Sequence, residues 1–166
     1  MLVPTIKLIA LCKIYRVRLE DEIKQTKPFT SEIQKLVLNI AFTSSWFNTV
    51  FAERLKPFGL SHHQFNVLRI LRGRYPESYC NQDIAQRMID KSSNATRIVD
   101  KLVEKDLVSR TEDKNDRRLV NICITDTGLA LLAEIDAAPF PEELKFKHFN
   151  EEKARLMNDW LDELRS

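Results

Sequence analysis

Apolar residues recur every three or four positions over most of the chain, which is the spacing of amphipathic α-helices. This pattern predicts helices over 31–56 and 61–72, a short one from a cap at Asn81, one from Ser92 or Ser93 to Lys105, one from about Asp126, and one from Asn150 to the C-terminus. Two short β-branched runs, 107–111 and 119–125, predict a hairpin with a long charged turn. The expected fold is mostly α with a small β-hairpin wing: a winged helix-turn-helix plus a helical dimerisation region.

Polar residues mark two of these helix starts. Ser61 and Gln64 form a capping box, in which each side chain satisfies the other residue's backbone N–H. Ser31 and Gln34 have the same spacing. Glycine and proline punctuation divides the chain into a 1–30 extension, a first dimerisation helix over 31–58, a winged domain over 60–125 and dimerisation helices over 126–166. The flanking helices carry more apolar surface than the winged core can cover, which favours pairing with a second copy of the chain.

The predicted helix before the hairpin has two contrasting faces. Its apolar stripe consists of Ala95, Ile98, Val99, Leu102 and Val103. Its opposite, water-facing side consists of Ser92, Ser93, Asn94, Thr96, Arg97, Lys101 and Lys105. The second helix of a helix-turn-helix lies in the major groove of DNA, with its N-terminal residues at base edges. This side is therefore the candidate DNA-binding surface, although a solvated surface helix would show similar residues.

The side chains on this surface divide by chemistry. Ser93, Asn94 and Arg97 are candidates for base edges, because asparagine can pair with adenine and arginine with guanine. A second group, better suited to phosphate, consists of Ser92, Thr96 and Lys101.

The hairpin turn adds two cations to the candidate surface. Arg117 and Arg118 would project from the tip, where a guanidinium can enter a narrow minor groove, and Asp116 could brace one of them. In isolation this tip fits a solvated charged loop with an internal ion pair better than a DNA contact. The helix and the tip together favour DNA.

Composition narrows the function classes. The 166 residues are 43% hydrophobic, and residues 61–124 carry 12 Lys and Arg against 9 Asp and Glu, a small positive excess in the region of the predicted DNA contacts. No glycine-rich phosphate loop is present, and no apolar run is long enough to cross a membrane. We therefore expect a cytoplasmic protein without catalytic activity, cofactor or metal site.

The cysteines and histidines support the same expectation. Cys12, Cys80 and Cys123 form no metal-binding or disulfide pattern, and the last two suit packed thiols better than sensors. His62 and His63 fit ordinary surface histidines, because adjacent helical side chains diverge. The 1–30 extension has poor periodicity; it could be helical over 6–23 and pack on the dimer, or come from an upstream start codon.

The central stretch resembles the MarR family of bacterial transcription regulators. The resemblance is carried by five segments in order: 60–65 (LSHHQF), 84–85 (IA), 92–102 (SSNATRIVDKL), 113–118 (DKNDRR) and 124–128 (ITDTG). One departure is Asp106, which stands where the family usually has glycine after the recognition helix; asparagine and aspartate tolerate the positive φ expected there better than most residues.

This resemblance implies a homodimeric repressor or activator. Its two recognition helices would bind a pseudo-palindromic operator in double-stranded DNA, with half-sites about 10 base pairs apart. Many members of the family also bind a small aromatic or acidic effector. Two other functions stay open at this stage: a winged-helix protein–protein interaction module without DNA binding, and an enzyme, for which the chain offers no recognisable nucleophile constellation.

Overall fold

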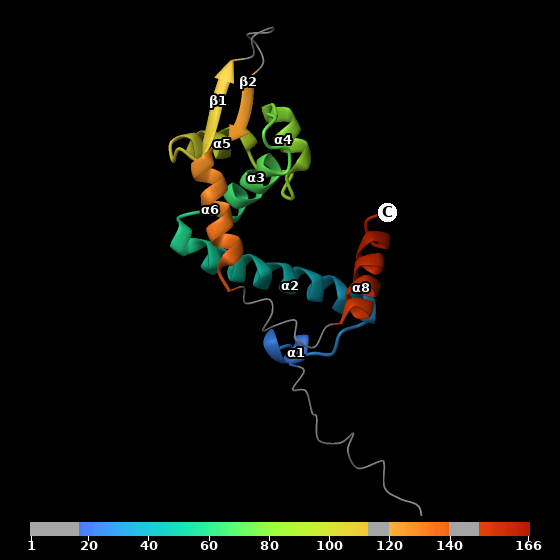
Figure 1. The fold of residues 1–166 in the computed structure, drawn as a ribbon. Coiled ribbons are helices and arrows are strands. Elements are labelled where there is room, and N and C mark those ends of the chain that lie inside the picture. The colour runs from blue at the N-terminus through green and yellow to red at the C-terminus, as the bar shows by residue number, and fades with distance from the viewer. Residues whose placement is uncertain (1–16, 113–119, 140–149) are drawn as a thin grey trace, which may run out of the picture. The chain divides into compact units, whose positions relative to one another are not determined.

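A computed structural model describes residues 17–112, 120–139 and 150–166 of the chain. The chain divides into two compact units, 1–46 and 47–166, and each is considered by itself below. The helix α2 (Glu32–Leu55) runs across this division. The described part of the chain is mostly helical with one antiparallel hairpin, as the sequence predicts (Figure 1).

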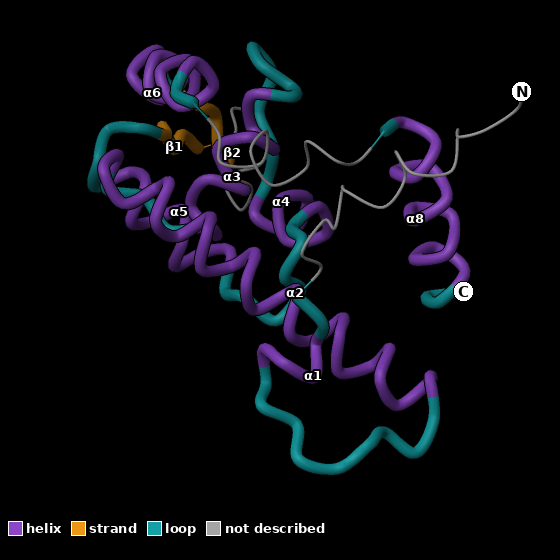
Figure 2. Tube along the Cα trace, turned by 90° about the horizontal axis from the view of Figure 1, so that it is seen from below, coloured by secondary structure: helices purple, strands orange, loops and turns teal. Residues whose placement is uncertain are grey.

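The second unit contains the winged helix-turn-helix. Three helices, α3 (His62–Arg72), α4 (Asn81–Arg87) and α5 (Ala95–Val103), pack against one another. The strands β1 (Val108–Glu112) and β2 (Val120–Ile124) follow, and the chain then enters α6 (Asp126–Ala137). Figure 2 shows the strands, in orange, against this group of helices; β2 contacts α3 and β1 contacts α5.

One hydrophobic core joins these elements. Its fully buried side chains come from α3, α4, α5, β2 and α6 and include Val67, Leu68, Leu71, Ile84, Val99, Leu102, Ile122, Leu132 and Ile135. Burying one such side chain contributes roughly 1.5–3 kcal/mol, so this shared core holds the short helices in place.

The start of α3 follows the prediction. Ser61 Oγ accepts from the backbone N–H of Gln64 at 3.2 Å, and Gln64 Oε1 accepts from the N–H of Ser61 at 3.0 Å. The helix ends at Gly73, as expected. At the start of α2, Ser31 Oγ accepts from Gln34 N–H, but the Gln34 side chain bonds Thr30 instead of Ser31.

Two other predicted helix starts were wrong by one to three residues. The N-cap of α4 is Cys80, with Asp83 accepting from its N–H and thiol, and Asn81 is already helical. The helix α5 begins at Ala95, after Ser92 and Ser93, and ends at Val103. The two serines are held outside the helix by hydrogen bonds to Asp90, which competes with helical geometry as short polar side chains do.

The hairpin has the register Val108↔Ile124 to Glu112↔Val120. An isolated antiparallel β-bridge extends the hairpin beside β2, because Tyr79 and Ile122 exchange two backbone hydrogen bonds of 2.9 Å. An ion pair of 2.7 Å between Arg110 on β1 and Asp100 on α5 ties the hairpin to that helix.

The end of α5 confirms the expectation for Asp106, which has φ of +56°. The N–H of Asp106 bonds the carbonyl of Val103, and that of Leu107 bonds the carbonyl of Leu102, which is the Schellman pattern. Thr125 Oγ1 also donates to the Asp106 carbonyl at 2.7 Å. The departure from glycine is thus accommodated without a change of fold.

The entry to α6 depends on a glycine. Thr125 caps the helix by accepting from the N–H of Gly128 at 3.0 Å. A Cβ at Gly128 would lie 2.3 Å from the carbonyl oxygen of Leu107 and 2.7 Å from Ile124 Cγ1. At the other end of α6, Arg54 from the last turn of α2 donates to the Ile135 carbonyl at 2.7 Å. These contacts hold α6 beside α3, where Arg72 pairs with Asp136.

The remaining helices flank the winged domain in sequence. In the first unit, the structure describes only residues 17–23 of the predicted 6–23 helix, and of these the four residues of α1 (Leu19–Glu22) are helical. Glu20 there bonds Lys35 of α2 at 2.7 Å, and this bond, with Arg18 nearby, lowers the pKa of the Glu20 carboxyl to about 2. Near the C-terminus, α8 (Glu151–Glu163) begins at the predicted cap, Asn150.

We expect Gly128→Ala to destabilise the fold by roughly 1–3 kcal/mol, because the added methyl group overlaps backbone as well as side-chain atoms. Gly73→Ala is the matched control: its Cβ would meet only ordinary contacts at 3.4 and 3.5 Å. Urea unfolding of the two variants measures the difference. Equal stabilities would contradict the close approach at Gly128.

Candidate nucleic-acid interface

One side of α5 is exposed and polar, and the other is buried. Thr96, Arg97 and Lys101 are exposed, whereas Val99 and Leu102 are completely buried. This separation agrees with the predicted stripe except at Val103, whose side chain is 38% exposed and does not belong to the core. The buried side fixes the rotation of the helix, so the polar side chains point outward.

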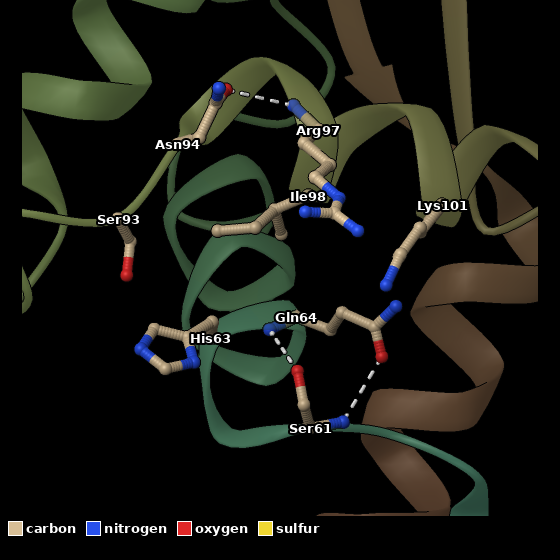
Figure 3. Close-up of a pocket in the computed structure, with 8 residues that line it drawn as sticks. All are labelled: Ser61, His63, Gln64, Ser93, Asn94, Arg97, Ile98 and Lys101. Atoms are coloured by element: carbon tan, nitrogen blue, oxygen red, sulfur yellow. Dashed lines mark hydrogen bonds between the residues drawn. The ribbon is translucent and has the colours of Figure 1, made fainter.

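An open pocket of about 420 Å³ lies where α5 crosses the start of α3 (Figure 3). Its lining comes from both helices and the turn before α5: Ser61, His63, Gln64, Ser93, Asn94, Arg97, Ile98 and Lys101. The structure therefore brings together four of the predicted contact residues and adds the N-cap of α3 and two polar residues of that helix. Two cations on one wall make this side of the domain suited to an anionic partner.

Asn94 caps α5. Its Oδ1 accepts from the backbone N–H of Arg97 at 3.1 Å, as Figure 3 shows. A cap of this kind typically contributes about 1 kcal/mol to helix stability. The cap uses one lone pair of the amide oxygen, so Asn94 can still offer the second lone pair and its amide NH2 group to a partner.

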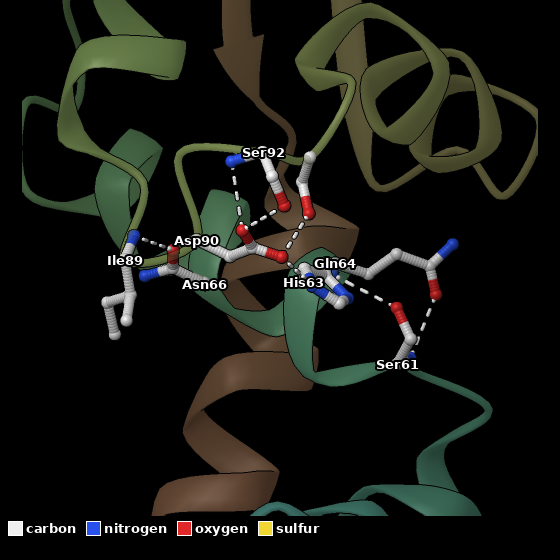
Figure 4. A network of polar contacts seen from close by, with 8 residues as sticks. Ser61, His63, Gln64, Asn66, Ile89, Asp90 and Ser92 are labelled. Atoms are coloured by element: carbon white, nitrogen blue, oxygen red, sulfur yellow. Dashed lines mark hydrogen bonds and ion pairs between the residues drawn. The ribbon is translucent and has the colours of Figure 1, made fainter.

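Asp90 organises the turn that leads into α5 (Figure 4). Its Oδ1 accepts from the backbone N–H and the hydroxyl of Ser92, at 2.9 and 2.7 Å. Its Oδ2 accepts from the hydroxyl of Ser93 at 2.7 Å and lies 3.0 Å from His63 Nε2 on α3. One carboxylate therefore fixes both serines and links their turn to the neighbouring helix.

These hydrogen bonds favour the charged form of Asp90. The bonds from Ser92, then those from Ser93 and His63, hold the pKa of the Asp90 carboxyl well below its usual range. The carboxylate is thus ionised at neutral pH and acts only as an acceptor.

A second link joins the same turn to α3. Asn66 Oδ1 accepts from the backbone N–H of Ile89 at 3.0 Å. Together with the contact between His63 and Asp90, it attaches the turn to α3 at two points, which are neighbouring residues in the turn and three residues apart on α3. The start of α5 is consequently positioned by α3 side chains as well as by the core.

The pattern of the sequence does not indicate the positioning roles of Asp90, His63 and Asn66. The sequence does carry one local signal for Asp90, which precedes Ser92 and Ser93 by two and three residues. An aspartate at this spacing commonly forms a turn in which its carboxylate accepts hydrogen bonds from the residues that follow. No comparable signal identifies His63, since its partner lies 27 residues away. Its neighbour His62 instead stacks on Phe51 at 5.1 Å, and burial lowers the pKa of the His62 imidazole.

Three further cations of the candidate DNA-binding surface are Lys105, Arg117 and Arg118. Lys105 is exposed but donates to the carbonyl of Gly59, which draws it towards α3. Arg117 and Arg118 lie outside the described residues, as does Cys12.

The other sequence features add no second site. Cys80 and Cys123 are half-buried free thiols, and Cys80 donates to Asp83. Within the described ranges, no three His, Cys, Asp or Glu side chains come together as a metal site. Of the helices that the structure describes, none combines the length and apolar character required to span a bilayer.

Comparison with known proteins agrees with this geometry. The model of the MarR family matches residues 60–120, which contain α3, α4, α5 and the hairpin. The crystal structure of a MarR transcription factor from Planctomyces limnophilus is 33% identical over 82% of this chain and 95% of that one, with a TM-score of 0.58. The chain belongs to the MarR family.

Two further proteins show how far the likeness extends. The uncharacterised HTH-type regulator YpoP of Bacillus subtilis is 33% identical over 57% of this chain and 55% of its own length. The chain thus spans about half of that curated relative. The structure of the C80S mutant of MarR from E. coli, complexed with operator DNA, has a TM-score of 0.70 at 21% identity over 83% and 99% of the two chains, which shows the shared fold.

The Asp90 network predicts a pH-dependent contribution to stability. Because folding lowers the pKa of this carboxyl, its stabilisation is present above the unfolded-state pKa of about 3.9 and is lost as the pH falls below that value. We expect Asp90→Ala to reduce the free energy of unfolding at pH 7 and to reduce it progressively less between pH 4 and pH 3. Urea titrations of both proteins at each pH measure this.

Asp159→Ala on α8 is the control, because Asp159 is an exposed carboxylate remote from this turn in the chain. Its effect should be small and should not follow the same profile. If the free energies of unfolding of the wild type and Asp90→Ala differed by the same amount from pH 7 to pH 3, the role assigned to the charge would be wrong.

Proposed function

We propose that this MarR-family regulator binds a pseudo-palindromic operator in duplex DNA as a homodimer. The observation that carries the proposal is the outward, cationic side of α5, on which Arg97 and Lys101 stand beside Ser93 and Asn94. The helix is held at both ends and its other side is buried, so the surface is formed before DNA arrives. Preformed contacts lose less conformational entropy on binding.

The contact residues have separate roles in this proposal. Arg97, Asn94 and Ser93 face base edges in the major groove, while Lys101, Thr96 and Ser92 lie towards phosphates. Arg117 and Arg118 reach the adjacent minor groove. Lys101 is well suited to a phosphate because it is exposed and its flexible ammonium acts as a point charge.

Dimerisation is supported by apolar side chains left exposed on the flanking helices. On α8 they are Leu156, Met157, Trp160 and Leu164, and on α2 they are Ile33, Leu36, Val37 and Leu38. On each helix most of these residues fall at the three- and four-residue spacing of one face, and large exposed apolar surfaces mark interaction sites. A second copy of the chain is the partner that fits, because two-fold pairing would place two α5 helices on the two halves of one operator.

We also propose that a small aromatic or acidic effector modulates DNA binding. The supporting observation is the aromatic series Phe47, Phe51 and His62, with ring centroids 6.5 and 5.1 Å apart, at the junction of α2 and α3. Such rings provide the apolar surface typical of small-molecule sites. An effector changes DNA affinity only if it binds two conformations of the dimer unequally.

Two substitutions on α5 test the DNA contacts. Lys101→Ala should weaken binding to all duplexes alike and reduce the slope of log affinity against log salt by about 0.9, because one phosphate contact is lost. Arg97→Ala should relax the preference at one operator position, at a cost of roughly 1–3 kcal/mol. Operator selection from random duplexes followed by fluorescence anisotropy at several salt concentrations measures both effects.

Arg155→Ala on α8 is the matched control, since it removes an exposed cation elsewhere and should leave slope and preference unchanged. If the wild-type protein selects no duplex sequence, or if both α5 variants bind as the wild type does, the proposed function is wrong.

The dimer is tested at Trp160, which is 66% exposed on α8. Sedimentation of the wild-type protein should give twice the 19.4 kDa of one chain, and Trp160→Glu should shift the population towards the monomer by placing a charge in an apolar interface. Asp159→Ala, one residue away, should remain dimeric. A monomeric wild type at micromolar concentration would exclude the homodimer.

A further inference from the structure

We infer that Asp90 fixes the hydroxyl of Ser93 as a hydrogen-bond acceptor towards DNA, so that Ser93 selects a base carrying an amino group. Asp90 contacts no DNA in this inference; it is a positioning residue that sets the chemistry of its neighbour. The inference rests on the proposed function and adds to it a direction of hydrogen bonding at one operator position.

A serine hydroxyl has one hydrogen to donate and two lone pairs that accept. Ser93 Oγ lies 2.7 Å from Asp90 Oδ2, and a carboxylate can only accept, so the hydrogen points to Asp90. Towards any other partner, Ser93 then offers lone pairs alone.

Further contacts of Asp90 stabilise this arrangement. The same carboxylate also accepts from the N–H and hydroxyl of Ser92, and His63 Nε2 lies 3.0 Å from it. The resulting low pKa keeps Asp90 ionised at the pH at which DNA is bound. Hydrogen bonds to an ionised acceptor are roughly twice as strong as neutral ones, so Ser93 has little reason to turn its hydrogen outward.

An acceptor that faces outward binds only hydrogen-bond donors. Phosphate oxygens and the guanine and thymine edges of the major groove present acceptors, which an acceptor does not bind. Adenine N6 and cytosine N4 present amino donors. Ser93 lines the open pocket together with Arg97 and Lys101, so the pocket offers cations for phosphate or guanine and one acceptor for an amino group (Figure 3).

Asp90→Asn is a nearly isosteric test of this direction. The backbone N–H of Ser92 can only donate, so it requires the amide oxygen of the new side chain on the Oδ1 side. The amide NH2 group then faces Ser93 and donates to its hydroxyl oxygen. This frees the Ser93 hydrogen to point outward, and the residue becomes a donor.

The experiment uses the full-length protein and two sets of duplexes. Operator selection with the wild type and with Ser93→Ala first identifies the position whose preference depends on Ser93. The amino group of that base is then removed, with purine in place of adenine or 2-pyrimidinone in place of cytosine. This substitution identifies which DNA strand carries the contacted base, whereas a selected sequence specifies only the base pair.

Removing the amino group should weaken wild-type binding about 2- to 10-fold, the range expected for one neutral hydrogen bond. Ser93→Ala should bind both duplexes equally, which controls for any effect on the duplex itself. Asp90→Asn should show no loss, because its Ser93 no longer accepts from the base. Asp159→Asn, the matched loss of a charge on α8, should behave as the wild type does.

Three results would overturn the inference. In the first, Ser93→Ala selects the same operator sequence as the wild type. In the second, removing the amino group leaves the affinity of the wild type unchanged. In the third, removing the amino group lowers the affinity of Asp90→Asn as much as that of the wild type. In each of these cases the wild type still selects an operator, so the proposed function stands. If the wild type selects no sequence, both the proposed function and this inference are wrong. Should Asp90→Asn not melt as the wild type does, the wild-type and Ser93→Ala measurements still decide whether Ser93 accepts.

Discussion

The burial of one side of α5 is the constraint on which the interface depends. With nine residues, this helix is too short to be stable alone, so it persists because Val99 and Leu102 are packed into the shared core. Turning the helix about its axis would expose these side chains and bury Arg97, at a cost of several kcal/mol. The same packing that stabilises the domain therefore determines which side chains a partner meets.

Polar contacts complete what the core begins, and they act mainly at the ends of the helix. Before α5, Asp90 holds the incoming turn, and Asn94 caps the first N–H groups. After it, Asp106 adopts a positive φ and Arg110 pairs with Asp100. A surface held in this way loses little freedom on binding, and its hydrogen-bond donors and acceptors are arranged in advance.

The match to the MarR family model coincides with this part of the chain, residues 60–120. A winged domain of this size depends on a closely packed core shared by α3, α4, α5 and the hairpin, which admits few alternative side chains. The flanking helices need chiefly an apolar face, a requirement that many sequences meet. The family is therefore shown most clearly by the winged domain.

The sequence alone determined the order of the elements, the wing, the capping box of α3 and the polar side of α5. These follow from the 3.6-residue and two-residue periods and from local capping, which depend on neighbours in the chain. The tertiary structure decided where α5 begins, that Val103 lies outside the core, and that His63 and Asn66 hold the turn before the helix. The start of α5 depends on competition between Asp90 and the helical backbone for the serines, and the contacts of His63 and Asn66 join residues more than 20 positions apart. Neither leaves a periodic trace in the sequence.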